Sequence, residues 1–198
     1  MNRAVTIRKI VQILIIATSL LSSGAFASTT EKVNTQPFAL TINNYNEILK
    51  SKLNKYEVTE TEKKIDPSSI NNTSINDTIF GYTDYANHKV VVYDAGKGII
   101  NNHTMDHEAG HVLDTLYNEK WTSPEVINFY SCSQDFQAIY EKEKYSTDGY
   151  SSEKYSDTQI EEYFAECFAW YIEKPEKLKQ SSPLTYEFID KVYNWKES

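Results

Sequence analysis

Apolar positions recur along this chain at two different spacings, and the spacing separates the expected helices from the expected strands. Residues 43–56 and 102–118 carry apolar side chains three to four positions apart, which places them on one face of a helix. Pro175 and Pro183 each predict the first turn of a further short helix. The pattern predicts an α+β fold that is mainly helical, with a small β-sheet.

Two short segments favour strands. Residues 88–93 contain three consecutive valines, whose β-branched side chains suit a pleated surface. Residues 78–82 form the other candidate strand, and residues 85–87 would make the turn between them. Residues 59–77 are rich in serine, asparagine, threonine and charge, which predicts a surface loop.

Capping patterns predict two more helices. A serine followed by proline and glutamate opens the segment 123–140, which is a good helix start. Ser156–Gln159 fits the capping box S-x-x-Q and would open a helix that runs to about residue 172. The polar stretch 141–157 between them predicts a long loop, and such loops in compact domains are often functional.

The first residues have the features of a secretory signal peptide. Three basic residues precede an apolar run at 10–21, and Ala25-Phe26-Ala27 matches the A-x-A cleavage signature. The run is shorter than the roughly 20 apolar residues that span a membrane, although a retained N-terminal anchor is the alternative. We expect cleavage after Ala27, secretion of residues 28–198 as a single domain, and no membrane association afterwards.

Charge and cysteine content narrow the possible functions. Residues 28–198 contain 17 basic and 28 acidic residues, a net charge of −11. The chain has no basic stripe, so we expect no nucleic acid partner. Cys132 and Cys167 fall in helical patterns, where buried free thiols are favoured over a disulfide. Neither cysteine is spaced like a zinc ligand.

The chemistry is concentrated in His107-Glu108-Ala109-Gly110-His111. Histidines four positions apart lie one turn apart on one face of a helix, where they can bind one zinc ion. Glu108 lies on the adjoining side, where it can act as the general base of a metallopeptidase. Asp114 extends the same face and would either support the zinc site or cap the end of a neighbouring helix. The motif is short enough to arise by chance.

A catalytic zinc site needs a third protein ligand. His88 is expected on a strand surface, and His103 either supports the site from outside or is solvated, because three stacked helical histidines do not form a tetrahedron easily. Residues 160–170 are apolar on most sides yet place Glu162 and Glu166 on one face. A divalent cation would relieve their repulsion, with Glu162 as ligand and Glu166 accepting a histidine ring N–H. The alternative to a metal site is an amphipathic helix whose acidic face is exposed to solvent.

These residues resemble a known family. His107–Asp114 followed by Glu161–Glu166 is similar to the metalloprotease domain of anthrax lethal factor, and more so to its small secreted relatives, the bacterial Pro-Pro endopeptidases. Residues 182–189 are also similar to the end of that domain, and the resemblance covers roughly residues 81–192. It implies a zincin-like fold with an HExxH active-site helix, one Zn²⁺ per chain, Glu162 as the third ligand, and Tyr155 as a catalytic residue that stabilises the oxyanion.

The sequence departs from that family in two places. Fifty-one positions separate His111 from Glu162, so an insertion is expected within residues 141–154. The Gly-Gly-Ser-Thr strand segment of the Pro-Pro enzymes is absent, and residues 80–85 stand in its place. Tyr145 and Tyr150 share the loop of Tyr155, so only the family spacing selects Tyr155.

The sequence thus predicts a secreted, monomeric zinc endopeptidase that acts on extended peptides, with Pro-Pro bonds as the leading substrate. The substrate is expected to add a strand to the sheet edge along residues 88–93, with Val91 and Glu161 as substrate-binding residues. A catalytically inactive binding domain of the same fold is the main alternative. The second alternative is a non-catalytic adhesion protein in which the motif arose by chance.

Overall fold

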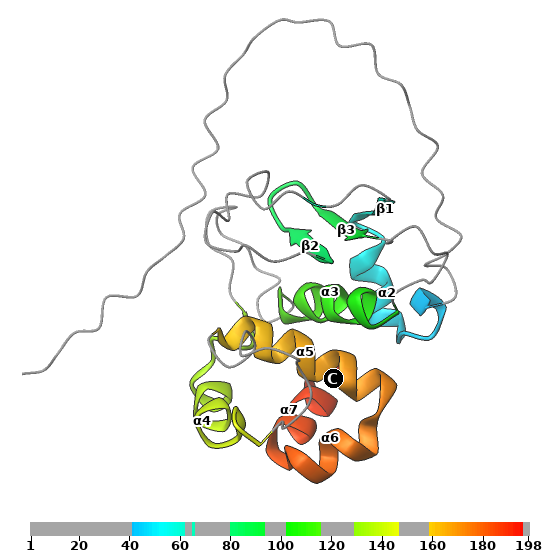
Figure 1. Ribbon diagram of the computed structural model, residues 1–198. Coiled ribbons are helices and arrows are strands. Elements are labelled where there is room, and N and C mark those ends of the chain that lie inside the picture. Colours follow the sequence, from blue (N-terminus) through cyan, green and yellow to red (C-terminus); the bar gives the residue numbers. More distant parts are fainter. Residues whose placement is uncertain are drawn as a thin grey trace, which may run out of the picture. The chain divides into compact units, whose positions relative to one another are not determined.

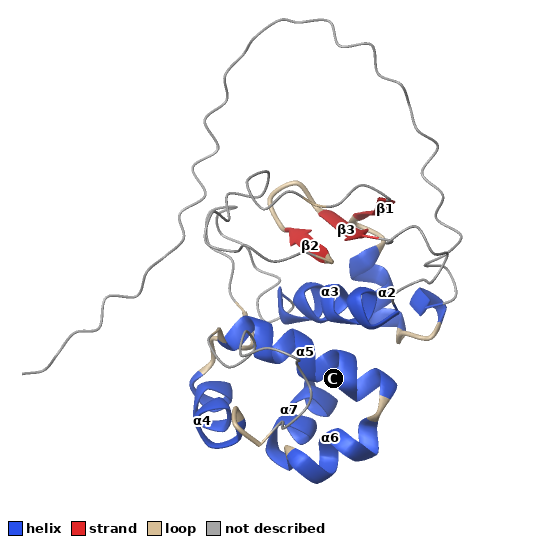
Figure 2. Cartoon of the chain, in the orientation of Figure 1, coloured by secondary structure: helices blue, strands red, loops and turns tan. Residues whose placement is uncertain are grey.

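The computed structural model describes residues 41–61, 65, 80–93, 102–115, 129–146 and 159–195. The mainly helical α+β fold with a small sheet is confirmed (Figures 1 and 2). The predicted signal peptide 1–27 and Tyr155 lie outside the described residues. Within those residues, no helix combines the length and the apolar character that crossing a membrane requires. The elements are α2 (Glu47–Leu53), β1 (Glu57–Thr61), β2 (Gly81–Asp84), β3 (Lys89–Tyr93), α3 (Asn102–Asp114), α4 (Gln134–Glu143), α5 (Ile160–Glu173), α6 (Pro175–Ser181) and α7 (Pro183–Tyr193).

The sheet has the order β1-β3-β2, so the valine-rich strand β3 is its centre. Strand β3 pairs in parallel with β1 and antiparallel with β2, with Val90 opposite both Val58 and Thr83. Its three valines are buried. Strand β1 corrects the prediction that 59–77 begins as a loop, and the first predicted strand, 78–82, is observed at Gly81–Asp84.

Helix α3 lies between the sheet and α5, and it contacts both (Figure 1). Its apolar side chains Met105, Ala109, Val112 and Leu113 are fully buried. Helix α5 can approach closely because Gly110 has no side chain: a Cβ at this position would lie 2.8 Å from the Cα of Ala165. The small residues at this crossing therefore bring the polar faces of α3 and α5 within reach of each other.

The helix starts agree only in part with the capping patterns. Residues 130–133 form bends and turns, and α4 begins after Ser133, whose Oγ accepts a hydrogen bond from the Phe136 N–H at 3.2 Å. The predicted helix over 123–140 is therefore wrong in that stretch, while residues 123–128 lie outside the described part. Helix α5 has Gln159 as its N-cap residue, so the predicted start at Ser156 is also wrong. Helices α6 and α7 begin at their prolines, as predicted.

The C-terminal helices pack around an aromatic core that fixes the orientation of α5. Phe136 of α4 contacts the rings of Tyr163, Phe164 and Phe188 at centroid distances of 6.1, 5.3 and 4.8 Å. Phe164 and Phe168 are fully buried, as expected for core residues. Cys132 and Cys167 are free thiols, as favoured over a disulfide. Cys167 is buried as expected, whereas Cys132 is exposed, so the prediction of a buried thiol is wrong for Cys132.

Candidate metal centre and active site

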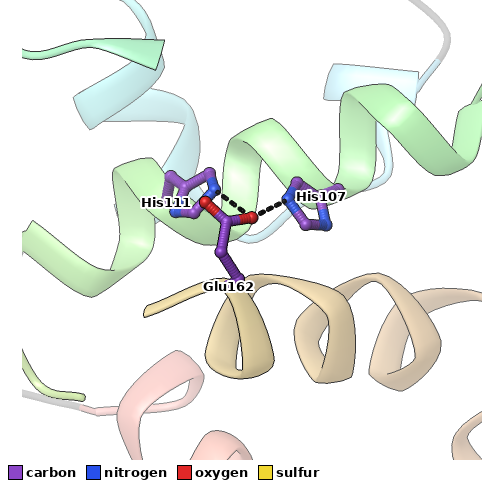
Figure 3. A group of neighbouring side chains, drawn as sticks. All are labelled: His107, His111 and Glu162. Carbon is purple, nitrogen blue, oxygen red and sulfur yellow. Dashed lines mark hydrogen bonds and ion pairs between the residues drawn. The ribbon is translucent and has the colours of Figure 1, made fainter. Parts of the chain in front are cut away.

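His107 and His111 lie one turn apart on α3, as their spacing predicts (Figure 3). Their ring centroids are 4.9 Å apart and their planes are nearly perpendicular, at 81°. His111 is buried and His107 is partly buried, so both rings are held inside the domain. Their Nε2 atoms point toward the same side of the helix, where α5 crosses.

Glu162 reaches this pair from the first turn of α5 (Figure 3). Its Oε2 lies 3.1 Å from Nε2 of His107 and 3.6 Å from Nε2 of His111. The three side chains each offer one ligand atom, and these atoms lie within 4.8 Å of one another. The arrangement brings together the two histidines and the carboxylate that the sequence predicts as a group.

The electrostatics of this group favour positive charge between the three side chains. Burial opposes a charged His107, but hydrogen bonds to Glu162 and Glu166 outweigh it and raise the pKa of His107 to about 10. Burial also disfavours a charged Glu162, yet the nearby histidines hold the pKa of its carboxyl well below the usual range. Two imidazoles and one carboxylate are a donor set that suits Zn²⁺, which can take the place of the bound protons.

Glu166 contacts the opposite edge of the His107 ring. Its Oε2 lies 3.2 Å from Nδ1 of His107, and its Oε1 accepts a hydrogen bond from Nε1 of Trp170 at 3.1 Å. Because Nδ1 is engaged by Glu166, Nε2 of the same ring is directed to Glu162. Glu166 therefore occupies the supporting position expected from its spacing, four residues after Glu162.

Glu108 is buried beside the two histidines and is held by the sheet. The Thr83 hydroxyl of β2 donates a hydrogen bond to its Oε2 at 2.7 Å. A Cβ on Gly81 would lie 2.6 Å from its Oε1, so a larger residue at this position would displace the carboxylate from where it lies. Burial raises the pKa of Glu108, against the opposing effects of His111, His107 and Thr83. Sequence reasoning did not identify Thr83 or Gly81, because no spacing rule links a strand to the motif helix.

The hydrogen bonds of Asp114 run to the turn that precedes α4. Asp114 is fully buried, and its carboxylate accepts hydrogen bonds from the Ser131 N–H at 2.8 Å and from the Ser131 hydroxyl at 2.6 Å. Burial raises the pKa of Asp114 to about 7, although the bonds from Ser131 oppose the shift. Asp114 thus ties the end of α3 to the turn that leads into α4.

The predicted substrate position along β3 is wrong. Both sides of β3 are occupied, by β1 and by β2, so this strand offers no free edge. Val91 lies in the middle of it and only 6% of its surface is exposed. Three consecutive valines are typical of a central strand, because such a strand is covered on both faces.

The other predicted site residues lie near the metal-ligand group or outside the described part. Glu161 precedes Glu162, and its Oε1 accepts a weak hydrogen bond from Sγ of Cys132 at 3.6 Å. Tyr155 and Tyr150 lie outside the described residues. Tyr145 is 71% exposed, and Nζ of Lys144 lies 5.3 Å from the centre of its ring.

Comparison with known proteins adds a family and a fold. The family described as "Anthrax toxin lethal factor, N- and C-terminal domain" matches residues 30–192 of this chain. A curated protein from Paenibacillus alvei named Pro-Pro endopeptidase is 35% identical over 106 residues, which are 50% of this chain and 42% of that protein. The matched part is therefore less than half of that relative's length.

A solved structure also resembles the chain. The Pro-Pro endopeptidase PPEP-2 from Paenibacillus alvei superposes with a TM-score of 0.55 and 22% sequence identity. The match covers 87% of this chain and 95% of that chain. At this level of identity the likeness shows a shared fold, within which α3, α5 and β2 surround the candidate site.

Proposed function

This chain belongs to the anthrax toxin lethal factor family, and on that premise we propose that it is a secreted zinc-dependent endopeptidase. The observation that carries the proposal is the convergence of His107, His111 and Glu162 beside the buried carboxylate of Glu108. Three ligands next to a candidate general base are the parts that metal-assisted peptide hydrolysis needs. The same convergence argues against a chance motif, because Glu162 comes from a different helix.

His107, His111 and Glu162 are the residues that would hold one zinc ion in each chain. When bound, Zn²⁺ supplies the Lewis acidity that polarises a peptide carbonyl and lowers the pKa of water toward about 7. Glu166 keeps the His107 ring oriented for this role through its contact with Nδ1.

Glu108 is proposed to move the proton. It accepts a proton from the attacking water and delivers it to the leaving nitrogen of the substrate. Thr83 occupies one acceptor site of Oε2, so the carboxylate still has acceptor sites for this proton. Burial raises the pKa of Glu108, which makes its carboxylate a stronger base for the proton of the attacking water than an exposed glutamate would be. By family resemblance, Tyr155 is proposed to stabilise the developing oxyanion.

The substrate is proposed to pair with the outer edge of β2. Strand β2 is at one end of the sheet, and its Thr83 contacts Glu108, so a peptide added there would lie beside the site. Strand β1 is at the other end and is separated from β2 by β3. Glu161, next to the ligand Glu162, is a further candidate for contact with the substrate.

Pro-Pro bonds are the first substrate class to test, because the P. alvei relative is named for that activity. Proline has no N–H, so two prolines at the cleaved bond cannot donate hydrogen bonds to β2. Pairing would then depend on the residues that flank the prolines, and specificity on pockets for the proline rings.

The test is cleavage of quenched-fluorescent peptides by protein collected after secretion. The peptides form matched pairs with Pro-Pro or Ala-Ala at the centre, and each is assayed before chelation, after chelation and after zinc is restored. We expect cleavage that chelation abolishes and zinc restores, and Pro-Pro peptides as preferred substrates. Zinc-loaded protein that cuts no peptide would instead indicate an inactive binding domain, and N-terminal sequencing shows whether cleavage follows Ala27.

A further inference from the structure

His103 lies one turn before His107 on α3 and contacts two carboxylates of α5. Its Nε2 is 3.3 Å from Oε2 of Glu166, and its Nδ1 is 3.2 Å from Oε1 of Glu173. Its ring also stands edge-on to Trp170, with centroids 6.0 Å apart. His103 is 37% exposed, whereas Glu166 is only 10% exposed, so this histidine covers the outer side of the buried carboxylate.

The two contacts determine the charge of His103. An ionised carboxylate can only accept hydrogen bonds, so a ring with carboxylates at both nitrogens must donate from both. That ring is the imidazolium cation. Glu166 raises the pKa of His103, against the effect of burial, in agreement with this geometry. His103 therefore places a positive charge beside Glu166, on the side away from the metal-ligand group.

Glu166 is held from three directions by this arrangement. Its Oε2 lies between His103 and His107, and its Oε1 accepts from Trp170. Glu162 lies one turn before it on α5 and carries the same negative charge. The cation of His103 offsets this repulsion and keeps the Glu166 carboxylate at Nδ1 of His107.

We propose that His103 is a positioning residue for the metal centre, which strengthens zinc binding by holding Glu166 against His107. The inference rests on the proposed zinc site and adds a residue that touches none of the ligands. The competing explanation is that His103 only fastens α3 to α5. A fastening role changes the stability of the fold, whereas a positioning role changes zinc affinity through Glu166.

A double-mutant cycle in zinc affinity tests the proposal, using competition with a fluorescent chelator. Alanine at position 103 keeps the helix intact, because alanine has the highest helix propensity. We expect His103→Ala to weaken zinc binding by about tenfold, the lower end of the range for residues that support metal ligands. His103→Gln retains a donor for Glu166 and should fall between His103→Ala and the wild type.

The cycle is completed with Glu166→Gln and with the double variant. If His103 acts through Glu166, the double variant should bind zinc no more weakly than Glu166→Gln alone. His88→Asn is the matched control, because it removes the other histidine that is not a proposed ligand, at a φ of 51° that asparagine tolerates. It should bind zinc like the wild type. Melting of each protein without metal records any change in stability.

The outcomes separate this inference from the proposed function. Non-additive losses in zinc affinity, with metal-free melting temperatures close to the wild type, support the positioning role. A wild type that binds zinc while His103→Ala binds it equally well overturns the inference and leaves the proposed function intact. Independent, additive losses overturn it as well. A wild type that binds no zinc overturns both.

Discussion

Thr83 and Glu108 join the sheet to the motif helix through a hydrogen bond of 2.7 Å from the threonine hydroxyl to Oε2 of the carboxylate. The contact fixes one oxygen of the proposed general base at the edge of β2, where the substrate is proposed to pair. Gly81, two residues earlier, leaves space for the other oxygen. The strand that would receive the substrate therefore also orients the residue that would transfer the proton.

Thr83→Val should lower kcat while zinc content and KM stay close to those of the wild type. Valine has the shape of threonine but cannot donate, and a hydrogen bond to a charged group is worth about 1.5–3 kcal/mol. The expected loss in kcat is roughly tenfold to a hundredfold, measured by steady-state cleavage of the best peptide. Thr83→Ser keeps the hydroxyl and should retain most of the rate. A fully active Thr83→Val enzyme would show that this contact does not orient Glu108 during turnover.

Tyr155→Phe should lower kcat by about 10²–10³-fold, the usual effect of removing one oxyanion donor. Zinc content should not change, because the phenol is not a proposed ligand. Tyr145→Phe is the matched control, since Tyr145 is 71% exposed beside Lys144. Tyr150→Phe is measured in parallel. If Tyr150→Phe lost the activity and Tyr155→Phe kept it, the family spacing would have selected the wrong tyrosine.

Glu143→Ala should destabilise the fold by about 2–3 kcal/mol, measured by urea unfolding without metal. The buried Glu143 carboxylate accepts from the N–H groups of Leu184 and Thr185, at 3.0 and 2.9 Å, and from the Thr185 hydroxyl at 2.8 Å. It thereby satisfies the N-terminus of α7, where the N-cap residue Ser182 makes no side-chain cap.

Glu141→Ala is the control for that measurement, because Glu141 is exposed and pairs with Lys144 in a surface contact of 3.0 Å. Its effect should stay within about 0.5 kcal/mol. Equal unfolding midpoints for the Glu141 and Glu143 variants would mean that the cap contributes nothing measurable to stability.

Cys132 should be alkylated slowly, on the order of a hundredfold more slowly than free cysteine at pH 8. Partial burial of the sulfur and the nearby negative charge of Glu161 raise the pKa of Cys132 to about 11, so little thiolate is present near neutral pH. The rate should rise with pH through about 11, and Glu161→Gln should increase it at pH 8. Iodoacetamide labelling followed by mass spectrometry measures it, with the buried Cys167 unlabelled until the protein is denatured. A rate like that of free cysteine would place Glu161 away from this thiol.

The metal-ligand group could be predicted from sequence because each half of it is local. His107 and His111 are four residues apart on one helix, and Glu162 and Glu166 are four apart on another, so helical periodicity places each pair on a face. The close crossing of α3 and α5 is encoded less visibly, in Gly110 and Ala165. Their small size gains a meaning only once the two helices are known to meet.

The sheet could be predicted only in part, because its pairing joins distant residues. Strand β1 has the sequence EVTET, in which only Val58 is apolar, and it forms because β3 pairs with it in parallel. No local pattern indicates that partner. The lack of a local signal for strand partners also explains why the predicted substrate position was wrong. The prediction placed the substrate along β3 rather than β2, and only the strand order shows which of them lies at the edge of the sheet. Thr83 was missed as a partner of Glu108 for the same reason, because it lies on β2.

The most direct test of the account compares two glutamates of one site that are proposed to act differently. Glu108→Gln and Glu162→Gln make the same chemical change on α3 and α5, and each protein is assayed for bound zinc and for peptide cleavage. The account predicts that Glu108→Gln retains about one zinc per chain but loses cleavage, because it keeps all three ligands and lacks the base. It predicts that Glu162→Gln binds zinc weakly and loses activity with the metal. Cleavage by Glu108→Gln at the wild-type rate, or full zinc binding and activity in Glu162→Gln, would contradict it.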